Sequence, residues 1–419
     1  MKPNNTIYKS GAILIASLLL FNYAIAQNKL RIGSWRGVLK LNDSTDLPFN
    51  FEVKYDLEIF SVAFTNAEER IVANEIAITG DSVFIRMPFF DSEFKLKSFG
   101  DSLKGVWINH ARKEKNILAF KAYYGTKERF EIKAWTNAEP LVTGKWEVEF
   151  EPGTADSYKS IGEFKQLNVT KGSKLTGTFL TETGDYRYLE GVMANYDFYL
   201  SCFDGAHAFL FKAKLDKNKD ILKGDFYSGA HGHETWIAKR NEKFELRNPD
   251  SLTYLKPGYK KIDFSFKNLE GKQISLSDEK YKNKEVIIQL MGTWCPNCMD
   301  ETKFLAPFYD KYKSKGLEII GLAFERTDDF NKAVSNINRL KSRFNANYDF
   351  LITMKTGSQQ ASEALPMLNK VMAFPTTIYI DKKGNVRKIY TGYYGPATGE
   401  SYIKQEEETK RFVEKLLSE

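Results

Sequence analysis

The sequence predicts a multidomain protein in which a duplicated, antiparallel all-β region is followed by an α/β domain. Two motifs of the first half recur about 110 residues further along the chain, a spacing that indicates duplication of a whole domain. Short runs in the same half alternate apolar and polar residues, as half-buried strands do. The last third alternates strand-like and helix-like segments, which is typical of a mixed sheet covered on both faces. A chain of 419 residues has room for two or three such domains.

Residues 1–26 predict a secretory signal peptide. Two lysines near the start precede an apolar stretch over residues 12–21, which is too short to span a bilayer comfortably. Ala24-Ile25-Ala26 then has the small-x-small pattern of a cleavage site, so we expect the mature chain to begin at Gln27. An uncleaved N-terminal anchor is the alternative. The prediction places the protein in the periplasm or cell envelope, where a dithiol stays reduced only if electrons are supplied.

Residues 27–138 and 139–244 are predicted to be two copies of one β module. The repeated motifs are Gly33-Ser34-Trp35 with Gly144-Lys145-Trp146, and Asp101-Ser102-Leu103-Lys104-Gly105-Val106-Trp107 with Asp220-Ile221-Leu222-Lys223-Gly224-Asp225-Phe226. Between turn signals such as Gly80-Asp81, runs like residues 49–55 alternate Phe, Val and Tyr with polar residues. We expect roughly 7–9 strands in each module, arranged as a barrel or a sandwich.

Other polar and reactive residues of the β region are expected to be structural. Cys202 shares a predicted strand face with Phe198 and Leu200, so we interpret it as a small core residue. His231 and His233 would share one strand face, but without a third ligand they do not predict a metal site. The formal charge of +7 is spread without a basic block, so no nucleic-acid partner is expected. No metal or cofactor is predicted.

The reactive element of the sequence is Trp294-Cys295-Pro296-Asn297-Cys298. It follows a predicted buried strand over residues 285–291 and precedes residues 299–315, which are rich in helix formers. The first turn of a helix has unpaired N–H groups and a partial positive charge, which favour a thiolate over a thiol. Cys295, just outside the helix, is therefore the predicted nucleophile. Cys298, one turn further in, can close a disulfide with it and release a bound partner.

Two inert interpretations of the Cys-x-x-Cys pair compete with redox activity. A zinc site needs a second pair of ligands at short spacing, but Cys202 and all four histidines lie well upstream. A structural disulfide across two residues would close little chain and constrain the unfolded state weakly. Redox activity is therefore the interpretation that the pattern favours.

Residues 252–419 are predicted to form the α/β domain, after a polar linker near residues 245–258. A hairpin signal lies at Leu269-Glu270-Gly271-Lys272, an inserted segment spans 356–370, and Pro307 should kink or interrupt the first helix. The expected strands cover residues 263–267, 285–291, 317–324, 348–353, 376–381 and a last strand to 390, and the expected helices follow Cys298 and cover 328–344 and 406–417.

This domain resembles the thioredoxin superfamily. The resemblance rests on the Cys-x-x-Cys pentapeptide together with Phe374-Pro375-Thr376-Thr377 before a strand. Glu301, three residues after the second cysteine, and the segment Thr391-Gly392-Tyr393-Tyr394-Gly395-Pro396 resemble the TlpA/ResA-type extracytoplasmic thiol–disulfide reductases. The resemblance covers residues 252–419 and says little about the β region.

The resemblance implies roles for several residues around the Cys295–Cys298 disulfide. Pro375 is expected to be cis and to face the disulfide, with Trp294, Phe374 and Thr376 beside a client that lies as an added strand. The buried acid of thioredoxin corresponds here to Gln289, which cannot titrate. Glu301 is expected to take over proton transfer to and from the cysteines. The alternatives are an ordinary trans proline and a glutamate on a solvated helix face.

The resemblance implies an exported thiol–disulfide oxidoreductase that reduces client proteins. Its expected partners are clients that carry disulfides and an upstream dithiol electron donor, membrane-borne, that re-reduces the enzyme. The residues alone allow an oxidase or isomerase equally well. One rival is a thiol peroxidase, although the Pro-x-x-x-Thr-x-x-Cys pattern is absent before Cys295. The other is a non-enzymatic surface-binding protein with a thioredoxin-like appendage.

Overall fold

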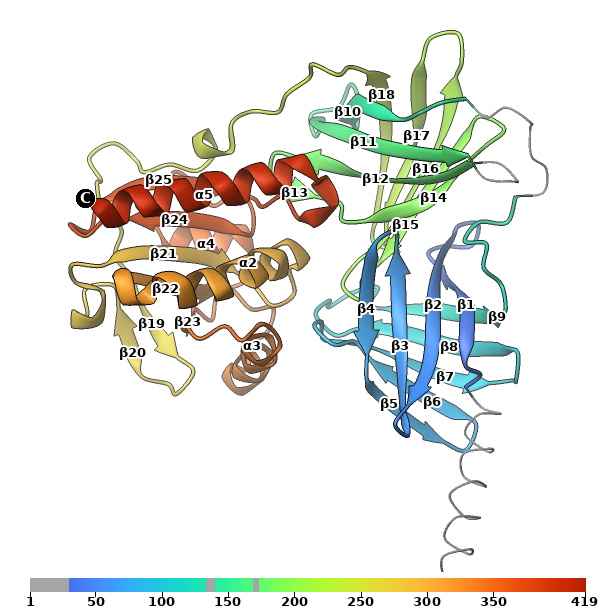
Figure 1. Ribbon diagram of the computed structural model, residues 1–419, viewed down its shortest axis with the longest axis horizontal. Coiled ribbons are helices and arrows are strands. Elements are labelled where there is room, and N and C mark those ends of the chain that lie inside the picture. The colour runs from blue at the N-terminus through green and yellow to red at the C-terminus, as the bar shows by residue number, and fades with distance from the viewer. Residues whose placement is uncertain (1–29, 133–139, 169–172) are drawn as a thin grey trace, which may run out of the picture.

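The computed structural model describes residues 30–132, 140–168 and 173–419, and the predicted signal peptide lies outside these residues. Within them the chain forms two nine-stranded antiparallel sheets, followed by a seven-stranded mixed sheet with helices (Figure 1). The predicted order, an all-β region and then an α/β domain, is confirmed. The α/β domain lies beside the β region, so the three sheets do not form a linear array (Figure 1).

The first sheet is a barrel-like meander with the order β4-β3-β2-β1-β9-β8-β7-β6-β5. Its two edge strands, β4 and β5, follow each other in the chain and are separated by Asn74. The strands are β1 (Gly33–Lys40), β2 (Asp46–Asp56), β3 (Ile59–Asn66), β4 (Glu69–Ala73), β5 (Glu75–Thr79), β6 (Ser82–Arg86), β7 (Ser92–Ser98), β8 (Ser102–Asn109) and β9 (Ile117–Tyr124).

The second sheet closes on itself. Its order is β11-β10-β18-β17-β16-β15-β14-β12-β13, and β11 also pairs with β12, which joins the two ends into a barrel. The strands are β10 (Gly144–Phe150), β11 (Tyr158–Asn168), β12 (Ser173–Thr181), β13 (Gly184–Asp185), β14 (Leu189–Ala194), β15 (Asp197–Phe203), β16 (Ala208–Asp216), β17 (Ile221–Ser228) and β18 (Gly232–Arg240). The β13 hairpin projects towards the α/β domain (Figure 1).

The repeated sequence motifs occupy equivalent places in the two barrels. Trp35 of β1 and Trp146 of β10 are both buried, and each indole N–H donates to the carbonyl four residues earlier at 2.9 Å. Gly105 and Gly224 lie in β8 and β17, where a Cβ would overlap a carbonyl oxygen of the neighbouring strand. The close approach of the two backbones explains why each copy of the motif has glycine there.

The two barrels share part of their packing. Phe203 of the second barrel belongs to the core of the first, where its ring stacks on Phe49 with centroids 4.5 Å apart. Arg129, almost fully buried, donates to the carbonyl of Ser201 at 3.1 Å and lies 3.4 Å from the carboxylate of Glu190. The sequence left open whether the modules pack together. In the structure they do, through an apolar contact and a paired buried charge.

The third sheet has the order β20-β19-β23-β22-β21-β24-β25, with β21, β22 and β23 parallel. One core packs α2, α3 and α5 against one face, and a second core packs α4 against the other. The elements are β19 (Ser265–Asn268), β20 (Gln273–Ser275), β21 (Glu285–Met291), α2 (Pro296–Tyr312), β22 (Leu317–Ala323), α3 (Phe330–Phe344), β23 (Asp349–Ile352), α4 (Gly357–Ala364), β24 (Thr376–Ile380), β25 (Val386–Thr391) and α5 (Glu400–Ser418).

The expected elements of this domain are found, with three differences. The inserted segment contains a helix, α4, and α5 begins six residues before the expected helix over 406–417. The helix α2 continues through Pro307, so the expected interruption does not occur. Eleven residues of α2, on both sides of this proline, are buried, and their tertiary packing outweighs the local preference.

The α/β domain should fold without the barrels. Its two cores are built from residues of 252–419, except for Phe90 and Ala206 and the partly buried Phe89, which come from the β region. We therefore expect residues 252–419 alone to unfold in a single cooperative thermal transition and to keep near-ultraviolet circular dichroism. A truncated chain that binds hydrophobic dyes and shows no cooperative transition would contradict this expectation.

Candidate active site

The Cys-x-x-Cys segment joins a fully buried strand to the start of a helix. All seven residues of β21 are buried, and α2 begins at Pro296, whose fixed φ suits the first helical position. Cys295 is the N-cap of α2, and its Sγ accepts a hydrogen bond from the backbone N–H of Cys298 at 3.2 Å. The predicted placement of both cysteines is confirmed. A donor aimed at Sγ and the positive end of the helix both stabilise a thiolate at Cys295.

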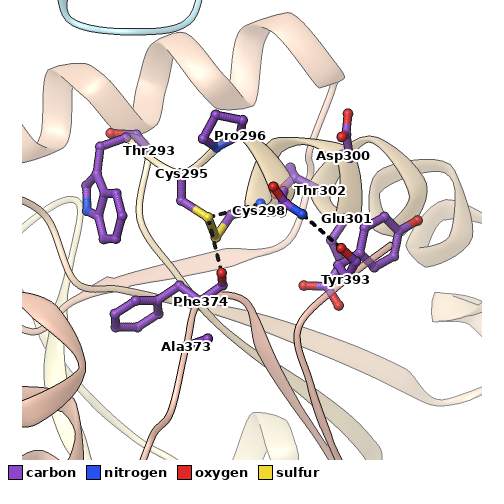
Figure 2. Close-up of a disulfide and its surroundings, with 12 residues drawn as sticks. Thr293, Cys295, Pro296, Cys298, Asp300, Glu301, Thr302, Ala373, Phe374 and Tyr393 are labelled. Atoms are coloured by element: carbon purple, nitrogen blue, oxygen red, sulfur yellow. Dashed lines mark hydrogen bonds between the residues drawn. A yellow bond between two sulfur atoms is a disulfide. The ribbon is translucent and has the colours of Figure 1, made fainter. Parts of the chain in front are cut away.

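Cys295 and Cys298 form a disulfide, with their Cα atoms 5.3 Å apart (Figure 2). Cys298 is completely buried, and Cys295 is only 5% exposed. Cys295 is thus the more accessible of the two, as predicted, but it does not lie in the open. The side chains of Trp294 and Phe374 meet edge to face beside it, with ring centroids 5.7 Å apart.

The peptide bond between Phe374 and Pro375 is cis, as the resemblance implies. The carbonyl oxygen of Phe374 lies 3.5 Å from Sγ of Cys295, so this loop faces the disulfide (Figure 2). Trp294 is held by its indole N–H, which donates to the carbonyl of Phe324 at 2.9 Å. Thr376 is placed next to the loop but is fully buried, and its hydroxyl donates to the carbonyl of Ala373. A client therefore cannot contact the Thr376 side chain in this arrangement.

Glu301 is buried beneath the disulfide, at 4% exposure, and not on a solvated helix face. Its carboxylate accepts hydrogen bonds from the side chains of Gln289, at 2.8 Å, and Thr377. Burial raises the pKa of Glu301 to about 7, against the opposing effect of these two donors. The Gln289 amide also donates to the carbonyl of Cys298 at 3.3 Å. Gln289 therefore links the titratable carboxyl to the backbone of the resolving cysteine.

Sequence reasoning missed a second buried carboxyl near the site. Glu325 accepts from the backbone N–H and the hydroxyl of Thr293, at 2.7 and 2.6 Å, and so fixes the turn before the cysteines. The guanidinium of the adjacent Arg326 lies 3.6 Å from the Trp294 ring centroid. Glu325 and Arg326 come just after the end of β22. Residues that follow parallel strands gather at one edge of a sheet, here the edge that also holds the cysteines. That position is the one signal that could have found them.

The second barrel also reaches the active site, which the sequence did not predict. The Asn297 amide, inside the Cys-x-x-Cys pair, donates to the carbonyl of Tyr393 at 2.9 Å and to Asp185 at 3.2 Å. Arg187, close by in the same barrel, pairs with Asp300 of α2. No local pattern near residue 185 marks it as part of a redox site. The β region and the α/β domain are therefore in direct contact and are not separated by the polar linker predicted near residues 245–258.

The remaining candidates of the β region lie away from the disulfide. Cys202 is buried in the core of the second barrel, as predicted, and burial raises the pKa of its thiol. His231 lies 2.8 Å from Arg112 and His233 lies 2.8 Å from Asp225, so the two rings have separate partners. The described residues contain no group of three or more His, Cys, Asp or Glu side chains that could hold a metal ion. No helix in the described ranges is long and apolar enough to cross a membrane.

Comparison with known proteins gives matches to the α/β domain. Residues 256–403 match the Redoxin family. Thiol-disulfide oxidoreductase ResA of Bacillus thuringiensis subsp. konkukian is 34% identical over 143 residues, which are 34% of this chain and 74% of that protein. ResA of Geobacillus thermodenitrificans is 30% identical over 130 residues, 31% of this chain and 66% of that protein. The crystal structure of a putative thiol:disulfide interchange protein DsbE from Chlorobium tepidum matches 39% of this chain and 99% of that chain, at 20% identity and a TM-score of 0.30.

The buried Glu301 should make stability depend on pH in the oxidised protein. The folded-state pKa of about 7 lies above the ordinary value of 4.5, so the unfolded chain releases this proton first. Stability from this group is fully present below about pH 4.5 and is lost as pH rises through about 7. Between about pH 5 and pH 8 the wild type should lose roughly 2 kcal/mol more unfolding free energy than Glu301→Gln. Urea unfolding at the two pH values measures this difference, and equal losses would contradict the buried carboxyl.

Proposed function

The chain belongs to the thioredoxin superfamily as a ResA-like thiol–disulfide oxidoreductase, and from this premise we propose that it is an exported enzyme that reduces disulfides of client proteins. The observation that carries the proposal is the hydrogen bond from the Cys298 N–H to Sγ of Cys295 at the start of α2. It stabilises negative charge on the sulfur that must attack. The N-terminal sequence pattern of residues 1–26 supports export.

The proposed reaction has two thiol–disulfide exchanges. The Cys295 thiolate attacks one sulfur of the client disulfide, forms a mixed disulfide and displaces the other client sulfur as a thiolate. Cys298 then loses its proton and attacks Sγ of Cys295, which forms the Cys295–Cys298 disulfide and releases the second client sulfur. The client takes up two electrons and two protons. A dithiol donor, which we place in the membrane, returns the enzyme to its reduced form.

Glu301 is the proposed acceptor of the Cys298 proton. A carboxyl with a pKa of about 7 is ionised in part of the molecules at neutral pH and can both take up and return a proton. The side-chain amide of its neighbour Gln289 donates hydrogen bonds to one carboxylate oxygen of Glu301 and, at 3.3 Å, to the carbonyl of Cys298. Because an amide cannot titrate, Gln289 orients this group without competing for the proton.

The client site is proposed to lie beside Trp294, Phe374 and Pro375. The cis bond places the Phe374 carbonyl next to Sγ of Cys295, and the two aromatic rings form an apolar edge there. An extended client could lie along this loop and present its disulfide to Cys295. The Thr376 side chain has no part in the proposal, because its hydroxyl is used within the loop.

Substitution of each cysteine by serine should distinguish the nucleophile from the resolving thiol. Cys298→Ser should accumulate client proteins as mixed disulfides on Cys295, because the resolving thiol is missing. Cys295→Ser should trap few, because the remaining Cys298 thiol is completely buried. Non-reducing gels of the cell envelope, with and without reductant, show the trapped species. If Cys295→Ser proves the better trap, the assignment of nucleophile and resolving thiol is reversed.

Replacement of the proton acceptor should alter turnover and its pH dependence. Glu301→Gln keeps the size and the hydrogen-bonding positions of the side chain but cannot take up a proton. Insulin reduction with dithiothreitol should slow by about a hundredfold, the lower end of what general base catalysis contributes, and lose its inflection near pH 7. Glu285→Gln is a matched control, since burial also raises the pKa of Glu285 to about 7 at the other end of β21. An identical pH–rate profile for Glu301→Gln and the wild type would remove Glu301 from the mechanism.

A further inference from the structure

The hairpin around β13 fixes the second barrel against the active-site end of the α/β domain. The carboxylate of Asp185 accepts from the backbone N–H of Gly395 at 2.6 Å and from the Asn297 amide at 3.2 Å. The backbones are also in close contact, since a Cβ on Gly392 would lie 2.6 Å from the carbonyl carbon of Thr183. Main chain and side chains of the barrel therefore fit the loops that surround the disulfide.

A buried charge cluster holds this contact in place. Arg187 is 8% exposed, and its guanidinium pairs with Asp300 of α2 and with Glu69 of the first barrel at 2.7 Å. Asp204 of the second barrel lies 3.9 Å away. One cation thus links the two barrels and helix α2 of the α/β domain. A buried charge that loses a partner is strongly unfavourable, so the docked arrangement is the stable one.

A cleft of about 600 Å³ is lined by residues of both the docked barrel and the α/β domain, and Cys295 is one of them. Trp294 and Phe374 line it from the α/β domain, and Tyr186 and Phe209 line it from the barrel. The barrel side is rigid, because the rings of Tyr186 and Phe209 meet edge to face at 5.3 Å within the aromatic core. The size is that of a site for a small ligand or for a few residues of one chain.

We infer that the second barrel forms the opposite wall of the client site, so that the enzyme accepts a disulfide on one flexible, extended segment and excludes a disulfide on a compact folded surface. This inference rests on the proposed function, since it concerns the same reaction of Cys295. A client that lies along Phe374 and Pro375 has the barrel on its other side and contacts aromatic side chains on both. A folded client would have to pass the barrel side chains that line the cleft before its disulfide could reach Cys295.

The first test uses the charges at the exposed edge of the barrel wall. Lys159 of β11 and Arg247, in the segment after β18, line the cleft and are solvent-exposed. They pair with Glu149 and Glu182 at the surface, where ion pairs contribute little to stability, so their reversal should leave the fold intact. The substrates are two flexible peptides, each with a single cysteine in a mixed disulfide with thionitrobenzoate. Glutamates flank the cysteine in one peptide, and lysines flank it in the other. In low salt, Lys159→Glu with Arg247→Glu should shift kcat/KM towards the lysine peptide by about tenfold relative to the wild type.

The matched control reverses Lys223, an exposed residue of β17 that does not line the cleft. Lys223→Glu should leave the preference between the two peptides unchanged. If the preference between the two peptides changes no more in the double variant than in Lys223→Glu, the inference is wrong, because a client bound in the cleft must interact with the charges that line it. If the wild type reduces neither the peptides nor hydroxyethyl disulfide, which is too small to be excluded by the barrel, the proposed reductase function itself is wrong.

The second test compares carriers of the same mixed disulfide. One carrier is the flexible peptide and the other is a small folded protein with the cysteine in the middle of a sheet face. The wild type should prefer the peptide by at least about tenfold. Asp185→Ala with Asp300→Ala removes contacts between barrel and α/β domain, and its preference should fall at least about threefold, with an increased radius of gyration by X-ray scattering. An expanded variant that keeps the wild-type preference would overturn the inference.

Discussion

The sulfur of Cys295 caps the helix α2, and the other parts of the active site are arranged around that single hydrogen bond. Buried strand β21 ends four residues before Cys295, so the sheet fixes where the helix can begin. A sulfur that accepts from the helix N–H groups is favoured as an anion, which is the state needed for attack. The cis peptide bond before Pro375 then brings a carbonyl oxygen against the same sulfur. The reactive atom thus lies between a stabilising donor and the edge of the client site.

Burial around this sulfur has two opposite effects: it disfavours an unpaired charge, and it strengthens the hydrogen bonds and ion pairs that stabilise charge. Burial disfavours charge, which is why the pKa of Glu301 rises to about 7. The same low-dielectric surroundings strengthen the Cys298 N–H donor and the charge pairs of Arg187. The site therefore combines a sulfur that is held ready to ionise with a carboxyl that can still exchange its proton. In a site open to water neither property would be as pronounced, since solvent would screen both.

Local patterns were sufficient to predict the α/β domain and its dithiol, because each depends on neighbouring residues. The apolar run of β21 predicted the strand with its correct ends, and the helix formers after Cys298 placed both cysteines. The duplicated motifs likewise predicted two similar β modules, but not whether each is a barrel or a sandwich. The docking of Arg187 on Asp300 could not be predicted, because it joins residues more than a hundred positions apart and nothing in the sequence around Arg187 marks it. The burial of Thr376 was missed for another reason: it is the first residue of β24, and all five residues of that strand are buried, so no alternation of apolar and polar residues marks an exposed face.

Asn297 has a consequence for how such a protein can change over evolution. This residue lies between the two cysteines, at the helix start that controls the thiolate, and its amide also bonds the second barrel through Asp185. A substitution that adjusts the reduction potential would therefore disturb the interface, and a change in the interface would be felt at the dithiol. Selection on electron transfer and selection on domain arrangement act on one side chain. The barrels are thus expected to co-vary with the motif.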